Sequence, residues 1–285
     1  MRDAAFQGLA VGFFDGVHLG HQAILKGADA ALTFRNHPLT VLAPDKAPRL
    51  IMSPEERVAT MKACGVKDVM VLEFTPELAE MPAEAFVSRY LVSSVSRLPS
   101  SIRCGENWRF GKGGAGNAEF LRRLGVDVVV APYVEYGGER ISSSRIRACL
   151  ERGEIEAANA MLGRRFKVSG SRFKGKGLGG KIGYPTLNLK LETLSIRLPL
   201  GVYEVEVKGV KAIANYGLAP TMGENAWTRP VMEIHLLGDG AEDESGETTD
   251  MASVTLVRYV RPERKFETVE DLKRQIAADC ATITT

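Results

Sequence analysis

The sequence predicts an α/β protein with two domains: an N-terminal doubly wound parallel sheet, and a C-terminal antiparallel β-barrel with a terminal helix. In the first half of the chain, short apolar strands alternate with helical segments, a pattern typical of parallel sheets. After Gly163 the helical pattern gives way to closely spaced alternating segments, which indicates antiparallel strands. The chain of 285 residues is also longer than one ordinary domain. We expect the domains to cover residues 1–162 and 163–285.

The first domain should contain five strands, each followed by a helical segment or a turn. The clearest helix start is at Ser53, an N-cap residue that precedes Pro54 and two acidic residues. Strands are expected at residues 8–14, 30–34, 66–74, 101–104 and 126–131. Helices are expected at residues 18–26, 54–63, 82–91, 118–124, 143–152 and 155–162.

The second domain should contain mainly antiparallel strands. Its terminal helix, expected at residues 268–280, has apolar residues three or four positions apart, at Val269, Leu272, Ile276 and Cys280. Strands are expected at residues 202–207, 212–214, 231–237 and 253–260.

Composition excludes several classes of protein. The net charge is only +2, which gives no support for a nucleic-acid or membrane partner. No apolar run approaches eighteen residues, so we expect no membrane span. The four cysteines are far apart and form no Cys-x-x-Cys pair, which argues against a zinc site or a disulfide framework. A reducing compartment fits this usage, and we expect a cytoplasmic protein.

A first cluster of chemistry-bearing residues lies where the first strand meets a helix. A turn at Asp15 leads into a helix opened by His18 and His21, and a helix N-terminus attracts phosphate. A lone histidine in such a place is more often structural, but strand, turn and helix start agree here. The phosphate-binding candidates are Gly12, Phe13, Asp15, His18 and His21.

A second cluster lies at the start of the helix expected at residue 143. Ser142 and Ser143 can cap this helix and donate to phosphate, and the Arg145 guanidinium can clamp two phosphate oxygens. Alone, the pattern fits an ordinary serine-capped helix with surface arginines equally well.

A third cluster is the loop at residues 175–183, which is dense in glycine and lysine. Its backbone N–H groups and ammonium charges can wrap phosphates, although such loops are also common hairpin connections. It is not a P-loop, because Ile182 replaces the required Ser or Thr and Pro185 blocks a following helix. The phosphate-binding candidates here are Gly175, Lys176, Gly177, Lys181 and Gly183.

These strings together resemble a known family. The segment at residues 12–21, with its His-x-Gly-His, and the segment at residues 141–147 look like the two signatures of the nucleotidyltransferase superfamily. More narrowly, they resemble the FMN adenylyltransferase module of bacterial bifunctional riboflavin kinase/FMN adenylyltransferases (FAD synthetases). The Gly-rich loop with its Pro-Thr-x-Asn at residues 185–188 is similar to riboflavin kinases. The resemblance covers nearly the whole chain.

The resemblance implies FAD biosynthesis from riboflavin. Riboflavin would be phosphorylated to FMN, and FMN adenylylated to FAD with release of pyrophosphate; ATP is the co-substrate and Mg²⁺ the cofactor. In the kinase domain it implies Glu233 as the general base, with Thr186 and Asn188 holding magnesium and ATP. In the first domain it implies His21 and Arg145 as catalytic residues. The flavin candidates are Asn107 and Arg109.

The chain departs from the family pattern at residues 35–36, 169–172 and 238–250 and, most clearly, in the segment after His21, and other functions stay open. Only about a dozen residues separate His21 from Phe34, so the helix between them should be short. One alternative is a riboflavin kinase with a degenerate first domain, and another is a non-catalytic flavin- or nucleotide-binding regulator. A third is an NAD-dependent dehydrogenase, because Gly-x-Gly-x-x-Gly occurs at residues 111–116, although the strand before it is polar. The sequence does not indicate an oligomeric state.

Overall fold

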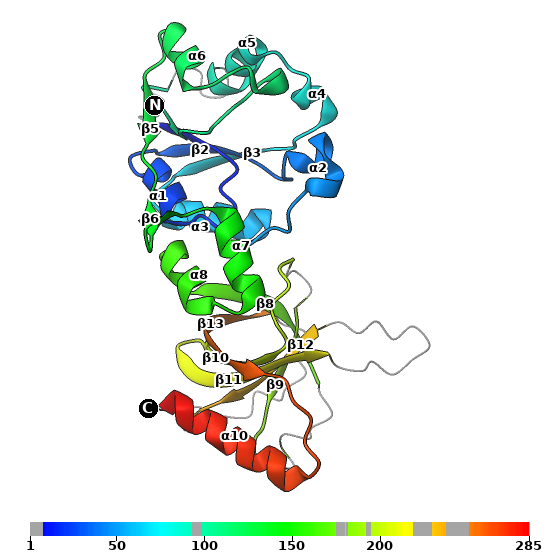
Figure 1. Cartoon of the computed structure of the whole chain (residues 1–285). Helices are drawn as coiled ribbons and strands as arrows, with labels where there is room; N and C mark the ends of the chain where they lie inside the picture. Colours follow the sequence, from blue (N-terminus) through cyan, green and yellow to red (C-terminus); the bar gives the residue numbers. More distant parts are fainter. Residues whose placement is uncertain are drawn as a thin grey trace, which may run out of the picture. The chain divides into compact units, whose positions relative to one another are not determined.

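The computed structural model (Figure 1) describes residues 8–92, 99–174, 180, 182–191, 195–218, 230–237 and 251–284. The chain forms two compact units, Met1–Arg145 and Ile146–Thr285, and each is described by itself. Among the described residues, no helix combines the length and the apolar character needed to cross a membrane.

The first unit is built on a five-stranded parallel sheet with the order β3-β2-β1-β4-β5. The chain runs outward from β1 to one edge and then returns to β4 beside it. This reversal is the switch point at which open α/β sheets bind ligands, outside the carboxyl ends of their strands. The strands are β1 (Leu9–Val11), β2 (Ala30–Phe34), β3 (Asp68–Leu72), β4 (Ile102–Gly105) and β5 (Val128–Ala131).

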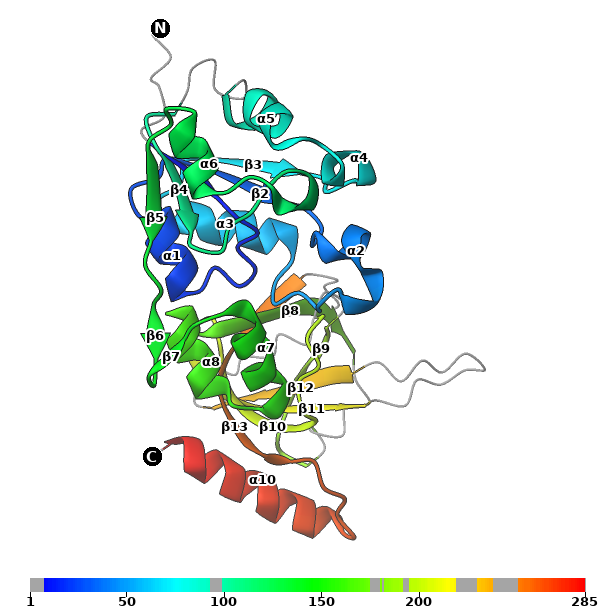
Figure 2. The same ribbon diagram turned by 45° about the horizontal axis from the view of Figure 1, so that its top comes forward.

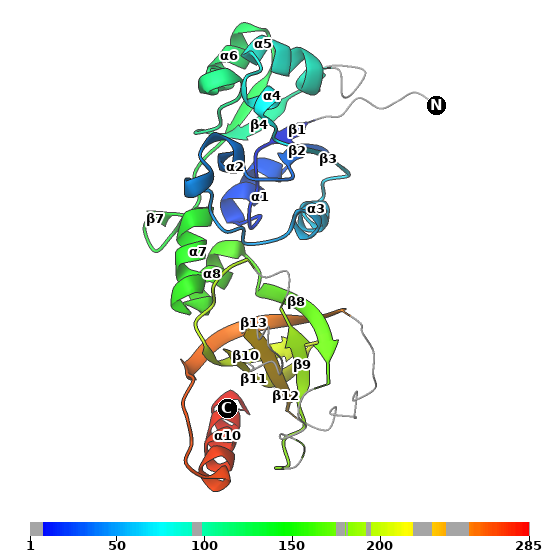
Figure 3. The same ribbon diagram turned by 90° about the vertical axis from the view of Figure 1, so that its right-hand side faces the viewer.

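Helices cover both faces of this sheet, which confirms the doubly wound prediction (Figures 1 and 3). Helices α1 (Leu19–Leu25) and α3 (Pro54–Ala63) lie on one face, where Phe14, Leu25 and Met61 are buried. Helices α5 (Ala83–Phe86) and α6 (Ala118–Arg123) lie on the other. Short elements connect these parts: α2 (Leu39–Leu42), η1 (Pro44–Lys46), α4 (Pro76–Ala79), η4 (Lys112–Gly114), β6 (Glu135–Tyr136) and β7 (Glu139–Arg140).

Several local predictions are confirmed. Helix α3 begins with a complete capping box, because the Ser53 side chain accepts from the Glu56 N–H and the Glu56 side chain accepts from the Ser53 N–H. Helix α1 has only seven residues, as the short segment after His21 required. The helix expected at residues 82–91 instead continues from α5 into a π-helical segment, η2 (Val87–Val92). This wider turn lets Phe86 and Leu91, five residues apart, both reach the same core cluster.

The second unit is a closed six-stranded barrel with the order β10-β11-β12-β9-β8-β13 (Figure 2). Every pair of neighbouring strands described is antiparallel. The strands are β8 (Phe166–Phe173), β9 (Leu187–Lys190), β10 (Gly201–Val207), β11 (Val210–Leu218), β12 (Pro230–Leu236) and β13 (Met251–Pro262). The helices are α7 (Ser143–Arg152), which begins in the first unit, α8 (Ile155–Leu162) and the terminal α10 (Val269–Thr284).

Helix α10 packs on the outside of the barrel. Its Ile283 joins a cluster with Val202 and Ile213, and Asp279, only 4% exposed, pairs with Arg261 of β13 at 2.6 Å. The Asp279 carboxylate also accepts from the Gln275 amide at 2.6 Å. An apolar cluster and a buried ion pair therefore attach this helix to the barrel.

Candidate active sites

The turn between β1 and α1 has an unusual backbone. Phe14 and Val17 have φ values of 58° and 39°, which are rare outside glycine and are found where a site imposes them. Asp15 is 2% exposed, and its carboxylate accepts from the Ile51 N–H at 3.0 Å. Asp15 thus holds the chain before α3 against this turn, and contact between Asp15 and ATP stays a prediction.

The two histidines of the turn form one rigid unit. The Nδ1 atom of His18 accepts from the His21 N–H at 3.2 Å, and the two imidazole rings stack with centroids 3.6 Å apart. Because Nδ1 is an acceptor, we assign the proton of a neutral His18 to Nε2. A Cβ at Gly20 would lie 3.1 Å from Cε1 of His18, so only glycine fits easily beneath this ring.

The structure brings the two signatures of the first domain together. The Ser143 hydroxyl donates to the backbone oxygen of Asp15 at 2.8 Å, across 128 residues of sequence. The Ser142 hydroxyl accepts from the Arg145 N–H at 3.3 Å, as a helix cap does. The start of α7 therefore lies directly against the β1–α1 turn.

The Arg145 side chain contacts Glu139 and not the β1–α1 turn. Its Nη1 donates to the Glu139 backbone oxygen at 2.8 Å, and its Nε lies 3.4 Å from the Glu139 carboxylate. These contacts direct the guanidinium to the β6–β7 hairpin, and its role at a phosphate stays a prediction. Arg147, four residues after Ser143, lies on the same face of α7 as Ser143, and the i, i+4 spacing is the signal that could have found it.

The two flavin candidates are exposed and are held by local contacts. Asn107 accepts from the Tyr133 hydroxyl at 3.0 Å, and the Arg140 guanidinium lies 3.5 Å from the centroid of the Tyr133 ring. Arg109 folds back on its own loop and donates to the Trp108 backbone oxygen at 2.8 Å. Flavin contact by Asn107 and Arg109 stays a prediction.

In the barrel, three polar residues form a row across neighbouring strands. Glu233 of β12 pairs in register with Asn188 of β9 on one side and with Asn215 of β11 on the other. Residues directly opposite in an antiparallel pair share a face of the sheet. Asn188 is 7% exposed, and its buried Oδ1 has no hydrogen-bond partner among the described residues. Such an oxygen is suited to a hard cation.

His235 is a residue that the sequence reasoning missed. Its Nδ1 lies 2.9 Å from the Pro185 backbone oxygen, and its ring contacts Tyr184 edge to face at 5.1 Å. It thereby fixes the segment that leads to Thr186, which is exposed. His235 follows Glu233 by two positions on one strand, so strand alternation places both on one face. Within the loop of the third cluster, Gly183 has a φ of +89°, and Gly175, Lys176, Gly177 and Lys181 lie outside the described residues.

Glu233 has the electrostatics of a candidate base. It keeps contact with solvent, but surrounding protein atoms remove part of its hydration, which raises the pKa of this carboxyl group. The negative charge of Glu263 raises the pKa of Glu233 further. Glu263 reaches β11 because Gly217 leaves room: a Cβ at Gly217 would lie 2.7 Å from the Glu263 Oε1.

Comparison with known proteins assigns a family to each half of the chain. Residues 3–145 match the FAD synthetase family, and residues 162–285 match the riboflavin kinase family. The bifunctional riboflavin kinase/FMN adenylyltransferase of Escherichia coli K12 is 33% identical over 95% of this chain and 90% of its own. The chain belongs to this bifunctional family.

A second family member is similar to this chain in sequence, and one solved structure is similar to it in fold. The riboflavin kinase/FMN adenylyltransferase of Bacillus subtilis is 30% identical over 95% of this chain and 89% of its own. A crystal structure titled as a macrolide-efflux protein from Streptococcus pneumoniae has a TM-score of 0.86 and 27% identity, and covers 99% of this chain and 94% of that one.

Membership of the riboflavin kinase/FMN adenylyltransferase family displaces the dehydrogenase alternative. The glycines at residues 111–116 begin six residues beyond the end of β4, whereas dinucleotide binding requires them in the turn that leads directly from a strand into a helix. They surround the short η4 turn instead, and Gly116 forms an isolated bridge with Phe110.

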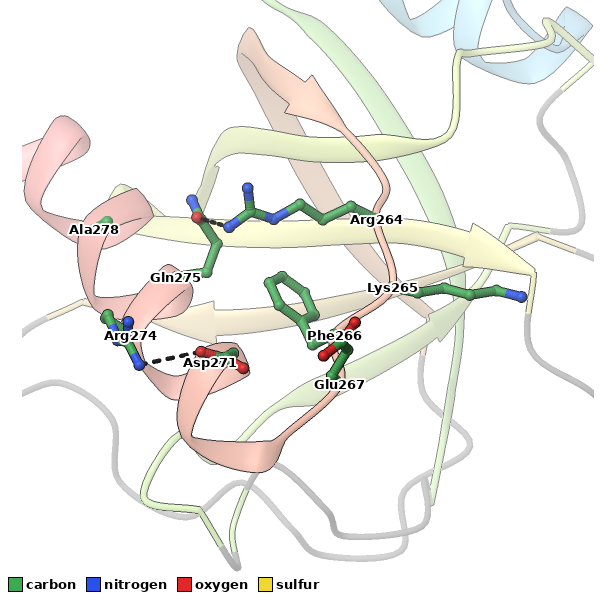
Figure 4. A pocket seen from close by; sticks show the side chains of 8 residues that line it. All are labelled: Arg264, Lys265, Phe266, Glu267, Asp271, Arg274, Gln275 and Ala278. Carbon is green, nitrogen blue, oxygen red and sulfur yellow. Dashed lines mark hydrogen bonds and ion pairs between the residues drawn. The ribbon is translucent and has the colours of Figure 1, made fainter.

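A hollow of about 470 Å³ lies beside α10 in the kinase unit (Figure 4). The Phe266 ring stands in it between charged side chains, and Arg264 bonds to Gln275 across it. An aromatic ring within a polar rim suits a flat, partly polar ligand. The lining residues are Arg264, Lys265, Phe266, Glu267, Asp271, Arg274, Gln275 and Ala278.

Proposed function

We infer that this chain makes FAD in two ATP-dependent steps, phosphorylating riboflavin to FMN and joining FMN to AMP with release of pyrophosphate. The observation that carries this inference is that one chain matches the families of both enzymes, each over a separate unit. The hydrogen bond between Ser143 and Asp15 supports the first site, because it unites two distant signatures.

In the adenylyltransferase step, positioning and charge would supply the catalysis. The FMN phosphate is itself the nucleophile and needs no base, so the protein has to align it with the α-phosphorus of ATP and stabilise the developing charge. We assign this stabilisation to His18, His21 and Ser142. For the guanidinium we retain Arg145 and add Arg147, because only Arg147 shares the helix face of Ser143.

In the kinase step, Glu233 would accept the proton of the ribityl hydroxyl as that oxygen attacks the γ-phosphate of ATP. A pKa above the ordinary value makes this carboxylate a stronger base. Asn188 and Thr186 fit a magnesium ion, because the buried Oδ1 of Asn188 lacks a partner among the described residues. When bound, magnesium would neutralise charge on the phosphates. The loop at residues 175–183 would bind those phosphates through its backbone.

We place the flavin ring of the kinase substrate in the hollow around Phe266. Its volume of about 470 Å³ lies within the range of small-molecule pockets. The ligands of the chain are thus riboflavin, FMN, FAD and ATP. We propose a cytoplasmic location, because the four cysteines Cys64, Cys104, Cys149 and Cys280, all of which the structure describes, form no disulfide.

Chromatography of purified protein with riboflavin, ATP and magnesium tests the function directly. FMN should appear first and FAD later. FMN alone would support the runner-up, a kinase with a degenerate first domain, and neither product from folded protein would refute both. The variant Glu233→Gln should lose FMN formation by at least about a hundredfold, within the range for a general base, while FAD formation from added FMN stays unchanged. Equal loss of both activities would contradict separate sites.

A further inference from the structure

A buried arginine lies at the carboxyl edge of the first sheet. Arg57 of α3 is 0% exposed. Its Nη2 donates to the backbone oxygens of Phe34 at 2.5 Å and Arg35 at 3.1 Å, where β2 ends. The face of its guanidinium lies 4.2 Å from the centroid of the Phe13 ring. One side chain thus contacts both the end of β2 and the loop after β1.

Stability alone does not account for this residue. The Nε and Nη1 atoms of Arg57 are buried and have no hydrogen-bond partner among the described residues. Burial lowers the pKa of the guanidinium, while the charges of Asp15 and Glu55 oppose that change, and arginine stays protonated. A buried charge with unsatisfied donors is costly, and an apolar side chain is often the more stable choice.

Phe13 connects Arg57 to the candidate phosphate loop. The Thr33 hydroxyl donates to the Phe13 backbone oxygen at 2.9 Å, and the edge of the His37 ring meets the Phe13 ring at 4.7 Å. Phe13 is therefore held by β2, by the segment after β2 and by Arg57. Its backbone follows Gly12, in the loop that leads to the stacked histidines.

We propose that Arg57 is a positioning residue of the adenylyltransferase site, which fixes the β1–α1 loop for the phosphates of ATP and of pyrophosphate. The side chain acts through Phe13 and does not itself touch the substrate. Its charge, held behind the loop in a low-dielectric interior, also favours a polyphosphate in front of the loop. This inference rests on the proposed FAD synthesis.

The test uses the full chain and isolates the first reaction. FAD formation is started from FMN and ATP, and the reverse reaction from FAD and pyrophosphate, in which pyrophosphate attacks the adenylyl phosphorus and FMN leaves. For Arg57→Met we expect the KM for ATP and the KM for pyrophosphate to rise by on the order of tenfold or more. The KM for ATP in riboflavin phosphorylation should stay unchanged. Arg57→Lys keeps the charge but not the planar bridge, and should fall between wild type and Arg57→Met.

A purely structural role predicts a different result. Destabilisation lowers the fraction of active enzyme, so the apparent kcat would fall, the KM would stay constant, and cooling would restore the rate; that outcome would overturn the proposal. The matched control is Lys62→Met, which removes one positive charge from the exposed side of the same helix and should leave each KM unchanged. An equal rise in Lys62→Met would reduce the effect to general charge and refute the positioning role.

A second variant tests the proposal if Arg57→Met does not fold. Phe13→Leu keeps the arginine but removes the ring through which it acts, and should raise the KM for pyrophosphate in the same way. If wild type makes no FAD from FMN, the proposed function fails. If wild type makes FAD while Arg57→Lys and Phe13→Leu keep its KM values, only this inference fails.

Discussion

Substitution of Gly20 by alanine should separate helix stability from catalysis. Gly20 lies inside α1, where alanine is favoured over glycine by roughly 0.5–1 kcal/mol. The added Cβ, however, would lie 3.1 Å from Cε1 and 3.2 Å from Nδ1 of His18. His18 is 5% exposed and stacked on His21, so its ring has little room to retreat.

The added methyl group should therefore move the His18 ring by a few tenths of an ångström. Overpacking of this kind costs about 1–3 kcal/mol, which offsets the gain in helix propensity. Displacement of a positioning group by up to about 1 Å can cost on the order of a hundredfold in rate. We expect Gly20→Ala to lower kcat/KM for FAD formation by about tenfold to a hundredfold and to leave kinase activity unchanged.

Steady-state assays of each reaction, with thermal unfolding of the same samples, measure both effects. The control Ala23→Gly weakens the same helix by roughly 1 kcal/mol without an added atom beside His18, and should keep its activity. Full FAD synthesis by Gly20→Ala would refute the reasoning, because the contact between residue 20 and the His18 ring would then have no catalytic consequence.

Three further predictions test other parts of the structure. Arg147→Ala should reduce FAD formation by at least about tenfold more than Arg145→Ala, since a guanidinium makes strong charge-assisted hydrogen bonds to phosphate only where it faces the phosphate. Rates of FAD formation from FMN and ATP measure this difference. Glu233 must be deprotonated to accept a proton, so its raised pKa places the acidic limb of the kinase pH–rate profile above the ordinary range for glutamate. Glu263→Gln removes a negative charge that raises this pKa and should move the limb to lower pH. An unmoved limb would contradict an effect of Glu263 on the pKa of Glu233. Asp279→Asn leaves the arginine of a buried ion pair without its partner charge and should lower the free energy of unfolding of the barrel by about 3 kcal/mol in urea titrations.

Strong local signals in the sequence were sufficient to predict much of the fold. The N-cap at Ser53 and the apolar strand at β2 each lie where the sequence predicted them, because neighbours in the chain determine both. Strand β8 was not predicted. It contains Gly170, which weakens the strand pattern, yet a Cβ there would collide with the Lys190 backbone oxygen of β9. The residue that obscured the strand is therefore required by a neighbour distant in sequence.

The candidate sites also divide into parts with a local sequence signal and parts that depend on residues distant in the sequence. The His-x-Gly-His motif could be recognised in the sequence because its residues lie within one turn of the chain. The contact of Arg145 with Glu139 depends on a two-stranded hairpin with exposed residues, for which the sequence carries little signal. Arg57 reads as one of several charged residues on a surface helix. Only its spacing of four from Met61, which is fully buried, shows that it faces the sheet.

The hydrogen bond from Ser143 to Asp15 has a consequence for biosynthesis. A ribosome releases the chain from its N-terminus at about 5–20 residues per second. The β1–α1 turn therefore emerges early, but its partner in α7 is made 128 residues later. The five strands can pair before α7 exists, whereas the geometry of the turn is completed only when this last helix docks. A nascent chain cut before residue 143 should thus form a sheet but no working adenylyl-transfer centre, which ties the first activity to the completion of its whole domain.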